Sequence, residues 1–155
     1  MGRSGSSVPR IFGVWWRQRI WIESIAIETI DEVLIANAEF YSCFEAKSLD
    51  RMSEVWEHSD LIRCTHPGWP TLKGWGTVSG SFFNLFHAEF GLQFLLTDTE
   101  VRIDNDIALV FCTENILGQG LGSSVSSLNI FHLDQIERRW RLIVHHASVA
   151  STTFN

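Results

Sequence analysis

The stretch RRWRLIVHHAS, residues 138–148, decides both the fold and the site that this sequence predicts. It is rich in β-branched and aromatic residues and contains no Gly or Pro, which predicts a β-strand. Side chains alternate between the two faces of a strand, so one face is expected to point to the core and to carry Trp140, Leu142, Val144, His146 and Ser148. The other, less apolar face carries Arg141, Ile143, His145 and Ala147.

His146 and Ser148 continue the apolar face beyond its packed part. Polar groups at the end of an apolar wall are typical of a ligand pocket. A second interpretation stays open, in which His146 is a buried histidine that one hydrogen bond satisfies.

The composition describes one globular domain. A chain of 155 residues with 45% hydrophobic and 19% charged residues can bury a real core. Residues 1–24 hold four Arg against one acid, a net charge of +3, whereas the rest holds eight bases against seventeen acids, a net charge of −9. An acidic domain lacks the positive surface that nucleic acid requires, so no nucleic-acid partner is expected.

The cysteines and the hydropathy favour a cytoplasmic protein. Cys43, Cys64 and Cys112 are odd in number and widely spaced, which is typical of reduced thiols. No apolar run approaches the roughly 20 residues of a membrane span. The N-terminal apolar segment is interrupted by charges and no small-residue cleavage site follows, so it does not match a signal peptide.

We expect residues 1–24 to form an N-terminal extension and residues 25–155 to form the domain. Residues 1–9 are rich in Gly and Ser, which predicts a loosely attached end. Residues 10–24 are basic and aromatic, and they could form an interfacial amphipathic segment or an arm that packs on a partner. The alternative is an extension without a role, and the change in composition at its end favours this alternative.

Three helices are expected in the N-terminal half. The first begins near Thr29, where Thr29 and Glu32 match a capping box, and ends near Lys47. Asn37 interrupts its apolar stripe and either faces a cavity or lies at the stripe's edge. Ser48 caps a short second helix, and residues 74–88 form a third despite Gly76 and Gly80.

Strands follow the helices. Residues 60–65 predict a short strand, which the turn HPGWP at 66–70 ends. Residues 99–103 and 107–111 alternate around a turn at 104–106, which predicts a hairpin. Residues 115–124 are expected to be a Gly-rich connection and residues 125–133 the next strand, with Asn129 and Phe131 on one face. Helices first and strands last predict an α+β fold with a curved, mostly antiparallel sheet around a helical layer.

Four segments together resemble the nuclear transport factor 2-like superfamily, in particular its SnoaL-like (polyketide cyclase-like) branch. They are FYSCFEAKSLDRM at 40–52, HPGWP with Leu72–Trp75, SLNIF at 127–131 and RRWRLIVHHAS. The resemblance covers roughly residues 28–150. It implies a cone-shaped sheet packed on three helices, a homodimer, and an apolar small molecule in the cone. Relatives include ketosteroid isomerases, polyketide cyclases, dehydratases, hydrolases and non-catalytic proteins, so the fold leaves the activity open.

Two functions remain open. In the first, His146 is the general base or acid on a small cyclic or carbonyl substrate without a cofactor, as a histidine pKa near ~6.5 allows. His66, the second catalytic candidate, or Asn129 would hydrogen-bond an oxygen on which negative charge develops. Asn129 would hydrogen-bond the ligand, and the remaining wall would consist of Trp69, Trp56, Phe40, Phe83 and Ser148. In the second, the protein is a non-catalytic ligand-binding or dimerisation module. We identify no Asp or Glu in this sequence that matches the catalytic carboxylate of the relatives.

A metal site is not expected, because neighbouring strand residues such as His145 and His146 point to opposite faces and cannot easily share an ion. A homodimer is expected through the outer face of the sheet. Apolar residues are expected on that face, namely Leu128, Ile130 and Ile143, and an exposed apolar patch usually marks an interface.

Overall fold

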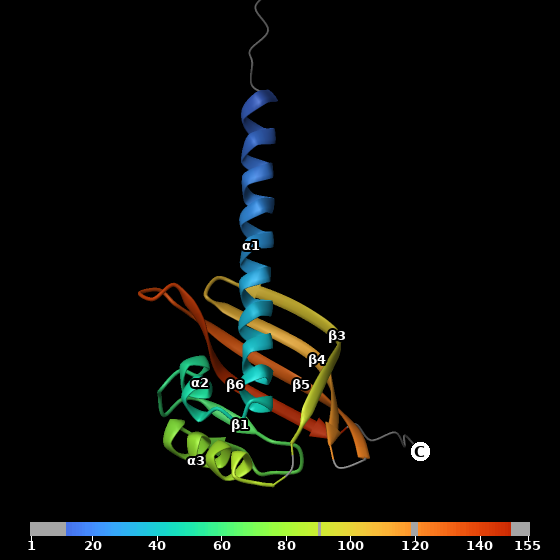
Figure 1. Cartoon of the computed structure of the whole chain (residues 1–155). Coiled ribbons are helices and arrows are strands. Elements are labelled where there is room, and N and C mark those ends of the chain that lie inside the picture. The colour runs from blue at the N-terminus through green and yellow to red at the C-terminus, as the bar shows by residue number, and fades with distance from the viewer. Residues whose placement is uncertain (1–11, 90, 119–120, 150–155) are drawn as a thin grey trace, which may run out of the picture.

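Three helices lie against one six-stranded sheet in the computed structural model (Figure 1). The structure describes residues 12–89, 91–118 and 121–149, with side chains from residue 29 onward except at residue 121. The helices are α1 (Phe12–Glu45), α2 (Leu49–Val55) and α3 (Trp75–Phe86). The strands are β1 (Arg63–Thr65), β2 (Leu72–Lys73), β3 (Gln93–Asp104), β4 (Ile107–Gly118), β5 (Leu121–Asp134) and β6 (Arg139–Val149).

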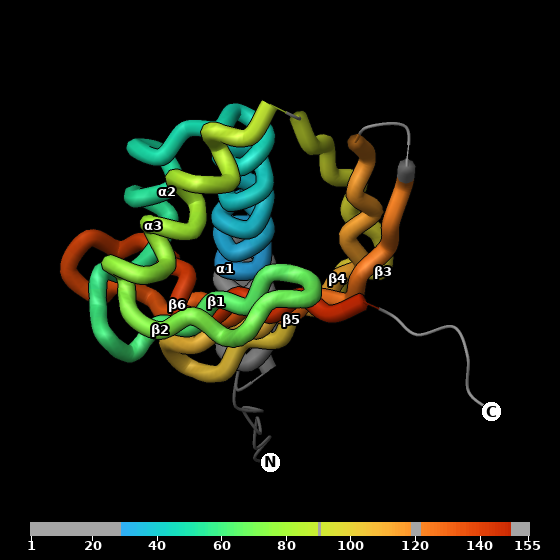
Figure 2. Tube along the Cα trace, turned by 90° about the horizontal axis from the view of Figure 1, so that it is seen from below, coloured from blue at the N-terminus to red at the C-terminus, as the bar shows by residue number. Residues whose placement is uncertain are grey.

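The strand order across the sheet is β2-β1-β6-β5-β4-β3. All neighbouring strands are antiparallel except β1 and β6, which are parallel. Figure 2 shows that the sheet curls around α1 and that α2 and α3 lie on the same side. The predicted α+β fold with a curved sheet around helices is therefore confirmed.

The first helix is much longer than the sequence predicted. It includes residues 12–28, so Thr29 and Glu32 lie inside α1 and the predicted start near Thr29 is wrong. The chain between Val14 and Thr29 has no Gly or Pro to end a helix, which explains the continuation. Figure 1 shows that the N-terminal half of α1 extends beyond the sheet. The prediction for residues 1–9 lies outside the described residues.

The other two helices are where the sequence placed them. The hydroxyl oxygen of Ser48 accepts a hydrogen bond from the backbone N–H of Arg51, which caps α2 as expected. The α3 helix follows Gly74, whose φ of 75° favours a residue without a side chain. Among the described residues, no helix is both long enough and apolar enough to cross a bilayer.

The hairpin of β3 and β4 is confirmed, but β4 and the next strand, β5, are longer than predicted. Residues 115–118 belong to β4 and residues 121–124 belong to β5, so the expected Gly-rich connection at 115–124 is wrong. Backbone pairing continues from Asn115–Ser124 to Gly118–Leu121. Ladder hydrogen bonds therefore override the weak strand preference of glycine in this segment.

A β-bulge in β6 overturns the predicted alternation. Phe131 pairs with Leu142 and Ile130 pairs with Val144, so Ile143 is an extra residue on β6. An extra residue shifts every later side chain to the opposite face. Leu142 is buried as predicted, but beyond the bulge it is His145 that is buried and His146 that is exposed.

An aromatic cluster forms the centre of the core. The ring of Phe40 on α1 lies with its centroid 4.9–6.5 Å from those of its aromatic neighbours, most of them in edge-on contact: Tyr41, Phe44, Trp56, Phe82 and His145. Edge-to-face aromatic pairs add roughly 0.5–1.5 kcal/mol each beyond their buried area. This cluster fixes α1 against α3 and β6.

Shortening Leu142 should destabilise the domain strongly, because its side chain is fully buried at the bulge. Leu142→Ala should lower the free energy of unfolding by about 2–5 kcal/mol, the usual cost of a core leucine truncation. Ile136→Ala is the matched control, since Ile136 is 93% exposed in the β5–β6 turn and should change stability by less than ~0.5 kcal/mol. Urea unfolding measures both, and equal effects would contradict the assigned core.

Candidate functional site

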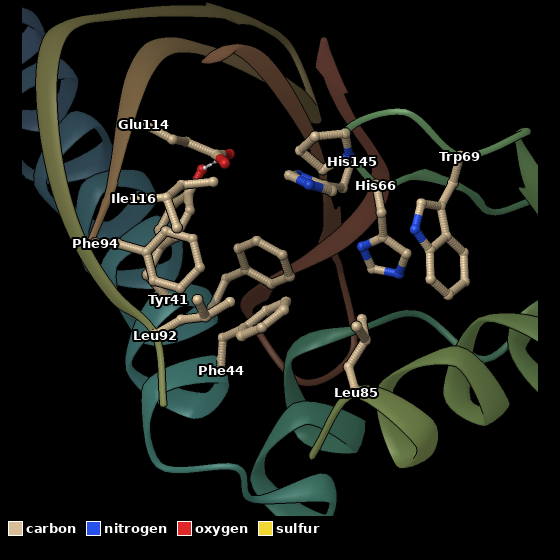
Figure 3. A pocket seen from close by; sticks show the side chains of 12 residues that line it. Tyr41, Phe44, His66, Trp69, Leu85, Leu92, Phe94, Glu114, Ile116 and His145 are labelled. Carbon is tan, nitrogen blue, oxygen red and sulfur yellow. Dashed lines mark hydrogen bonds between the residues drawn. The ribbon is translucent and has the colours of Figure 1, made fainter. Parts of the chain in front are cut away.

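A cavity of about 190 Å³ lies between α1 and the concave face of the sheet (Figure 3). The turn after β1 forms its mouth with Pro67 and Trp69, whose side chain is partly exposed. The walls are mostly apolar and aromatic, which is typical of a site for a small organic molecule. They consist of Phe40, Tyr41, Phe44, His66, Leu85, Leu92, Phe94, Glu114, Ile116 and His145.

Four elements place the polar groups of this pocket. Tyr41 lies on α1, Glu114 on β4 and His145 on β6, and His66 is the first residue after β1. The parallel pairing of β1 with β6 sets Cys64 opposite His145. His66, two residues after Cys64, therefore lies close to His145. The ring centroids of His66 and His145 lie 6.3 Å apart. Figure 3 shows Tyr41 and Glu114 across the pocket from the two histidines.

The side-chain amide of Asn129 connects the two sides of the pocket. Its Oδ1 lies 2.7 Å from Nδ1 of His145, and its Nδ2 donates to the hydroxyl of Tyr41 at 3.0 Å. The same Nδ2 donates to Oδ1 of Asn37 at 2.8 Å. Asn129 is fully buried, so these hydrogen bonds replace all of its contacts with water.

Glu114 ends this chain of hydrogen bonds. The hydroxyl of Tyr41 donates to Oε1 of Glu114 at 2.7 Å, and both residues are buried. Burial raises the pKa of Glu114, while hydrogen bonds from Tyr41 and Ser127 act in the opposite direction. Burial and the nearby Glu114 raise the pKa of the Tyr41 phenol, which therefore stays protonated.

Burial keeps both pocket histidines neutral at neutral pH. It lowers the pKa of His145 to about 3, with smaller contributions from the neighbouring His66 and His146. It lowers the pKa of His66 to about 4. A charged imidazole is disfavoured there because the apolar surroundings replace its hydration shell.

The structure places three of the predicted site residues in the pocket wall, namely His66, Trp69 and Phe40. Asn129 lies directly behind the wall and holds two of its residues. Asn37, for which the sequence left two positions open, is buried and accepts a hydrogen bond from Asn129.

Four predicted site residues lie elsewhere. His146 and Ser148 are exposed on the opposite face of β6, because the bulge at Ile143 inverts the alternation. Trp56 is fully buried in the core outside the pocket wall, and its indole nitrogen has no hydrogen-bond partner among the described residues. Phe83 is 50% exposed on the outer side of α3 and packs on His87.

Sequence reasoning missed His145, Glu114 and Tyr41. Alternation along β4 could have found Glu114, since Ala108, Val110, Cys112 and Glu114 all face inward. The prediction followed the opposite face, which Ile107, Leu109 and Phe111 share, and it ended the strand before Glu114. Among the described residues, no group of three or more His, Cys, Asp or Glu side chains could hold a metal ion.

Comparison with known proteins identifies the domain. A family model described as a SnoaL-like domain matches residues 33–152. A crystal structure from Streptomyces avermitilis, described as a proposed dehydratase of the NTF2-like family, is 35% identical. The similarity covers 82% of this chain and 99% of that chain, with a TM-score of 0.75.

Two further relatives have other names. The F-box protein SKIP8 of Arabidopsis thaliana is 27% identical over 129 residues, which cover 83% of this chain and 53% of that protein, so the chain spans about half the length of this curated relative. A crystal structure from Thiobacillus denitrificans, described as a proposed calcium/calmodulin-dependent protein kinase type II association domain, is 28% identical, with a TM-score of 0.64 over 75% of this chain and 93% of that chain. The chain belongs to the SnoaL-like domain family, within the NTF2-like superfamily.

Proposed function

We propose that the protein binds a small, apolar, ring-containing molecule in this pocket and transfers a proton on it without a cofactor. The observation that supports this function best is the meeting of Glu114, Tyr41 and His145 in one aromatic cavity, joined through Asn129. An apolar pocket with a few oriented polar groups binds a small organic molecule and fixes its orientation.

Glu114 is the proposed acid–base group. Burial raises the pKa of its carboxyl group, and a raised pKa makes a carboxylate a better proton acceptor. Tyr41 holds one carboxylate oxygen in place. His145 takes the role that the sequence analysis gave to His146, and His66 keeps its predicted place in the pocket. As neutral imidazoles, the two histidines orient the ligand by hydrogen bonds.

The relative from Streptomyces avermitilis favours an enzyme, because it is named as a proposed dehydratase and aligns over almost its whole length. Loss of water requires a proton to leave a carbon atom and a second proton to reach the departing hydroxyl group. As a carboxylate, Glu114 would take the proton from the carbon atom and, once protonated, give it to the departing hydroxyl group, while the imidazoles on the other side of the cavity hold the ligand.

A non-catalytic binding module is the second candidate. The pKa of His145, about 3, makes this imidazole a poor proton carrier at neutral pH. The relatives named as an F-box protein and as a kinase association domain also point away from catalysis. Turnover of a bound ligand, followed by NMR, separates the two functions.

We also propose that two copies associate through the outer face of the sheet. Cross-strand pairing sets Leu109, Ile130 and Val144 side by side there, and sets Phe111 beside Leu128 in the next row. These residues form a partly exposed apolar surface, as expected of an interface. Ile143, which the sequence assigned to this face, instead packs against the core at the bulge.

Replacing His145 should weaken ligand binding more than replacing its neighbour. A screen of small cyclic molecules by NMR should give ligands that shift resonances of the pocket residues. His145→Gln should weaken their binding about tenfold, because it removes an oriented imidazole from the wall, whereas His146→Gln should change it less than twofold. Ligands that respond to His146→Gln and not to His145→Gln would contradict this site.

Stability should fall as the pH falls below 6.5. The pKa values of His145 and His66 are about 3 and about 4 in the folded state, against 6.5 for an unperturbed histidine, so the unfolded chain takes up these two protons first. Each histidine should lower the free energy of unfolding by up to about 1.4 kcal/mol per pH unit between pH 6.5 and about 4. Urea unfolding at a series of pH values measures this slope.

Two variants separate the contributions to this slope. His145→Gln should remove about half of it, because one of the two neutral histidines is gone. Glu114→Gln should make the loss toward acid steeper, because a carboxyl group with a raised pKa favours the folded state as the pH falls. A slope that His145→Gln leaves unchanged would show that the histidine is not buried in the neutral form.

Phe111→Asp should dissociate the proposed dimer, because it places a charge at the centre of the apolar surface on β4. Sedimentation velocity at tens of micromolar should show the wild type as a dimer and this variant as a monomer. Leu61→Asp is the control, since Leu61 is exposed outside the strands of the sheet. A monomeric wild type would refute the interface.

A further inference from the structure

The hydrogen bonds of Asn129 determine which nitrogen of His145 carries the proton. Nδ2 of Asn129 already donates to Asn37 and to Tyr41, so Oδ1 is the atom left for His145. A carbonyl oxygen only accepts, which places the hydrogen of the neutral imidazole on Nδ1. The other nitrogen, Nε2, then has a free lone pair, and among the described residues no partner uses it.

The same reasoning applies to His66. The hydroxyl of Ser81 donates its hydrogen to the carbonyl oxygen of Val78 at 2.7 Å. Its oxygen therefore accepts from Nε2 of His66, which lies 3.0 Å away. The hydrogen of the neutral His66 is on Nε2, so Nδ1 keeps a lone pair and has no partner in the described part of the chain.

Tyr41 and Glu114 offer no donor either. The one hydroxyl hydrogen of Tyr41 is given to Glu114, and the phenol oxygen accepts from Asn129. Oε1 of Glu114 accepts this hydrogen, and in the ionised form, from which the proposed proton transfer starts, the carboxylate only accepts hydrogen bonds. The one side-chain donor left in the wall is the indole N–H of Trp69, which lies at the mouth on a side chain that is 42% exposed.

We propose that the natural ligand is a neutral ring compound that carries a hydroxyl or N–H donor at its inner end. The deep side chains of the pocket present acceptors on both sides, so a ligand donor completes a hydrogen bond that the protein leaves open. A carbonyl or ether oxygen in the same place would face other acceptors and lose its hydration without compensation. This inference rests on the proposed function, and it narrows the substrate class to alcohols, phenols and N–H heterocycles.

The size of the cavity limits the ligand to one or two rings. An engineered apolar cavity of roughly 150 Å³ in another protein holds benzene. The cavity here is about 190 Å³ and opens beside Trp69. A substituted single ring or a small fused ring therefore fits, with its donor between Glu114 and the histidines and its apolar part among the phenylalanine rings.

Pairs of ligands that differ only in the donor test the proposal on the wild-type protein. The pairs are para-cresol with its methyl ether, indole with N-methylindole, and phenylethanol with acetophenone. Titration calorimetry or NMR titration should show that the compound with the O–H or N–H group binds about tenfold more tightly than its partner in each pair. This is the effect of one hydrogen bond to an otherwise unpaired acceptor. The NMR shifts should map to the pocket residues His66, Tyr41 and His145.

A variant reverses the polarity of one wall. Glu114→Gln introduces an amide that can donate, so the preference for the donor in each pair should shrink at least threefold. His146→Gln is the control and should keep the full preference, since His146 is exposed on the other face of the sheet. If Glu114→Gln fails to fold, the ligand pairs on the wild type still decide the question.

The outcomes separate this inference from the proposed function. Equal or tighter binding of the three compounds without a donor, namely the methyl ether of para-cresol, N-methylindole and acetophenone, would overturn the donor requirement and leave the proposed pocket intact. If none of the six compounds shifts the pocket resonances up to its solubility limit, both proposals fail. Donor preference that survives Glu114→Gln unchanged would also overturn the inference, because it would assign the preference to another part of the protein.

Discussion

The buried amide of Asn129 is the interaction on which the site depends. It lies at 0% exposure between α1, β4 and β6, and it connects Asn37, Tyr41 and His145 at distances of 2.7–3.0 Å. A buried polar atom without a partner costs about 1–3 kcal/mol, so each of these groups needs the others to stay inside. The same amide also decides the tautomer of His145. The side-chain amide of Asn129 therefore fixes both the positions of the pocket side chains that it contacts and the nitrogen of His145 that carries the proton.

The bulge at Ile143 decides which side chains of β6 meet this amide. Without the extra residue, a strand that buries Trp140 and Leu142 would also bury Val144 and His146. With it, Val144 turns to the outer face and His145 turns inward to Asn129. One inserted residue therefore supplies an apolar group to the proposed interface and an imidazole to the pocket.

The sequence predicted the fold well because the fold depends on average properties. The alternation at 99–103 and 107–111, the cap at Ser48 and the turn at 66–70 each reflect local preferences that the structure keeps. The errors arose where a single residue determines the face of a strand or the start of a helix. The bulge at Ile143 has no signal in a single sequence, since any strand residue can be the extra one. The capping pattern at Thr29 also occurs inside a helix, and only the absence of a breaker before it shows the difference.

The candidate site was harder to predict, because its chemistry arises from burial and contacts across the fold. Glu114 lies between the predicted strand at 107–111 and the predicted Gly-rich connection at 115–124, and its partner Tyr41 lies 73 residues away. A sequence shows that a carboxyl group exists, but its pKa depends on the phenol, the hydroxyl and the apolar walls that surround it. The same burial that raises the pKa of Glu114 lowers the pKa values of His66 and His145. Both pocket histidines are therefore neutral, and the direction of their hydrogen bonds distinguishes one ligand from another.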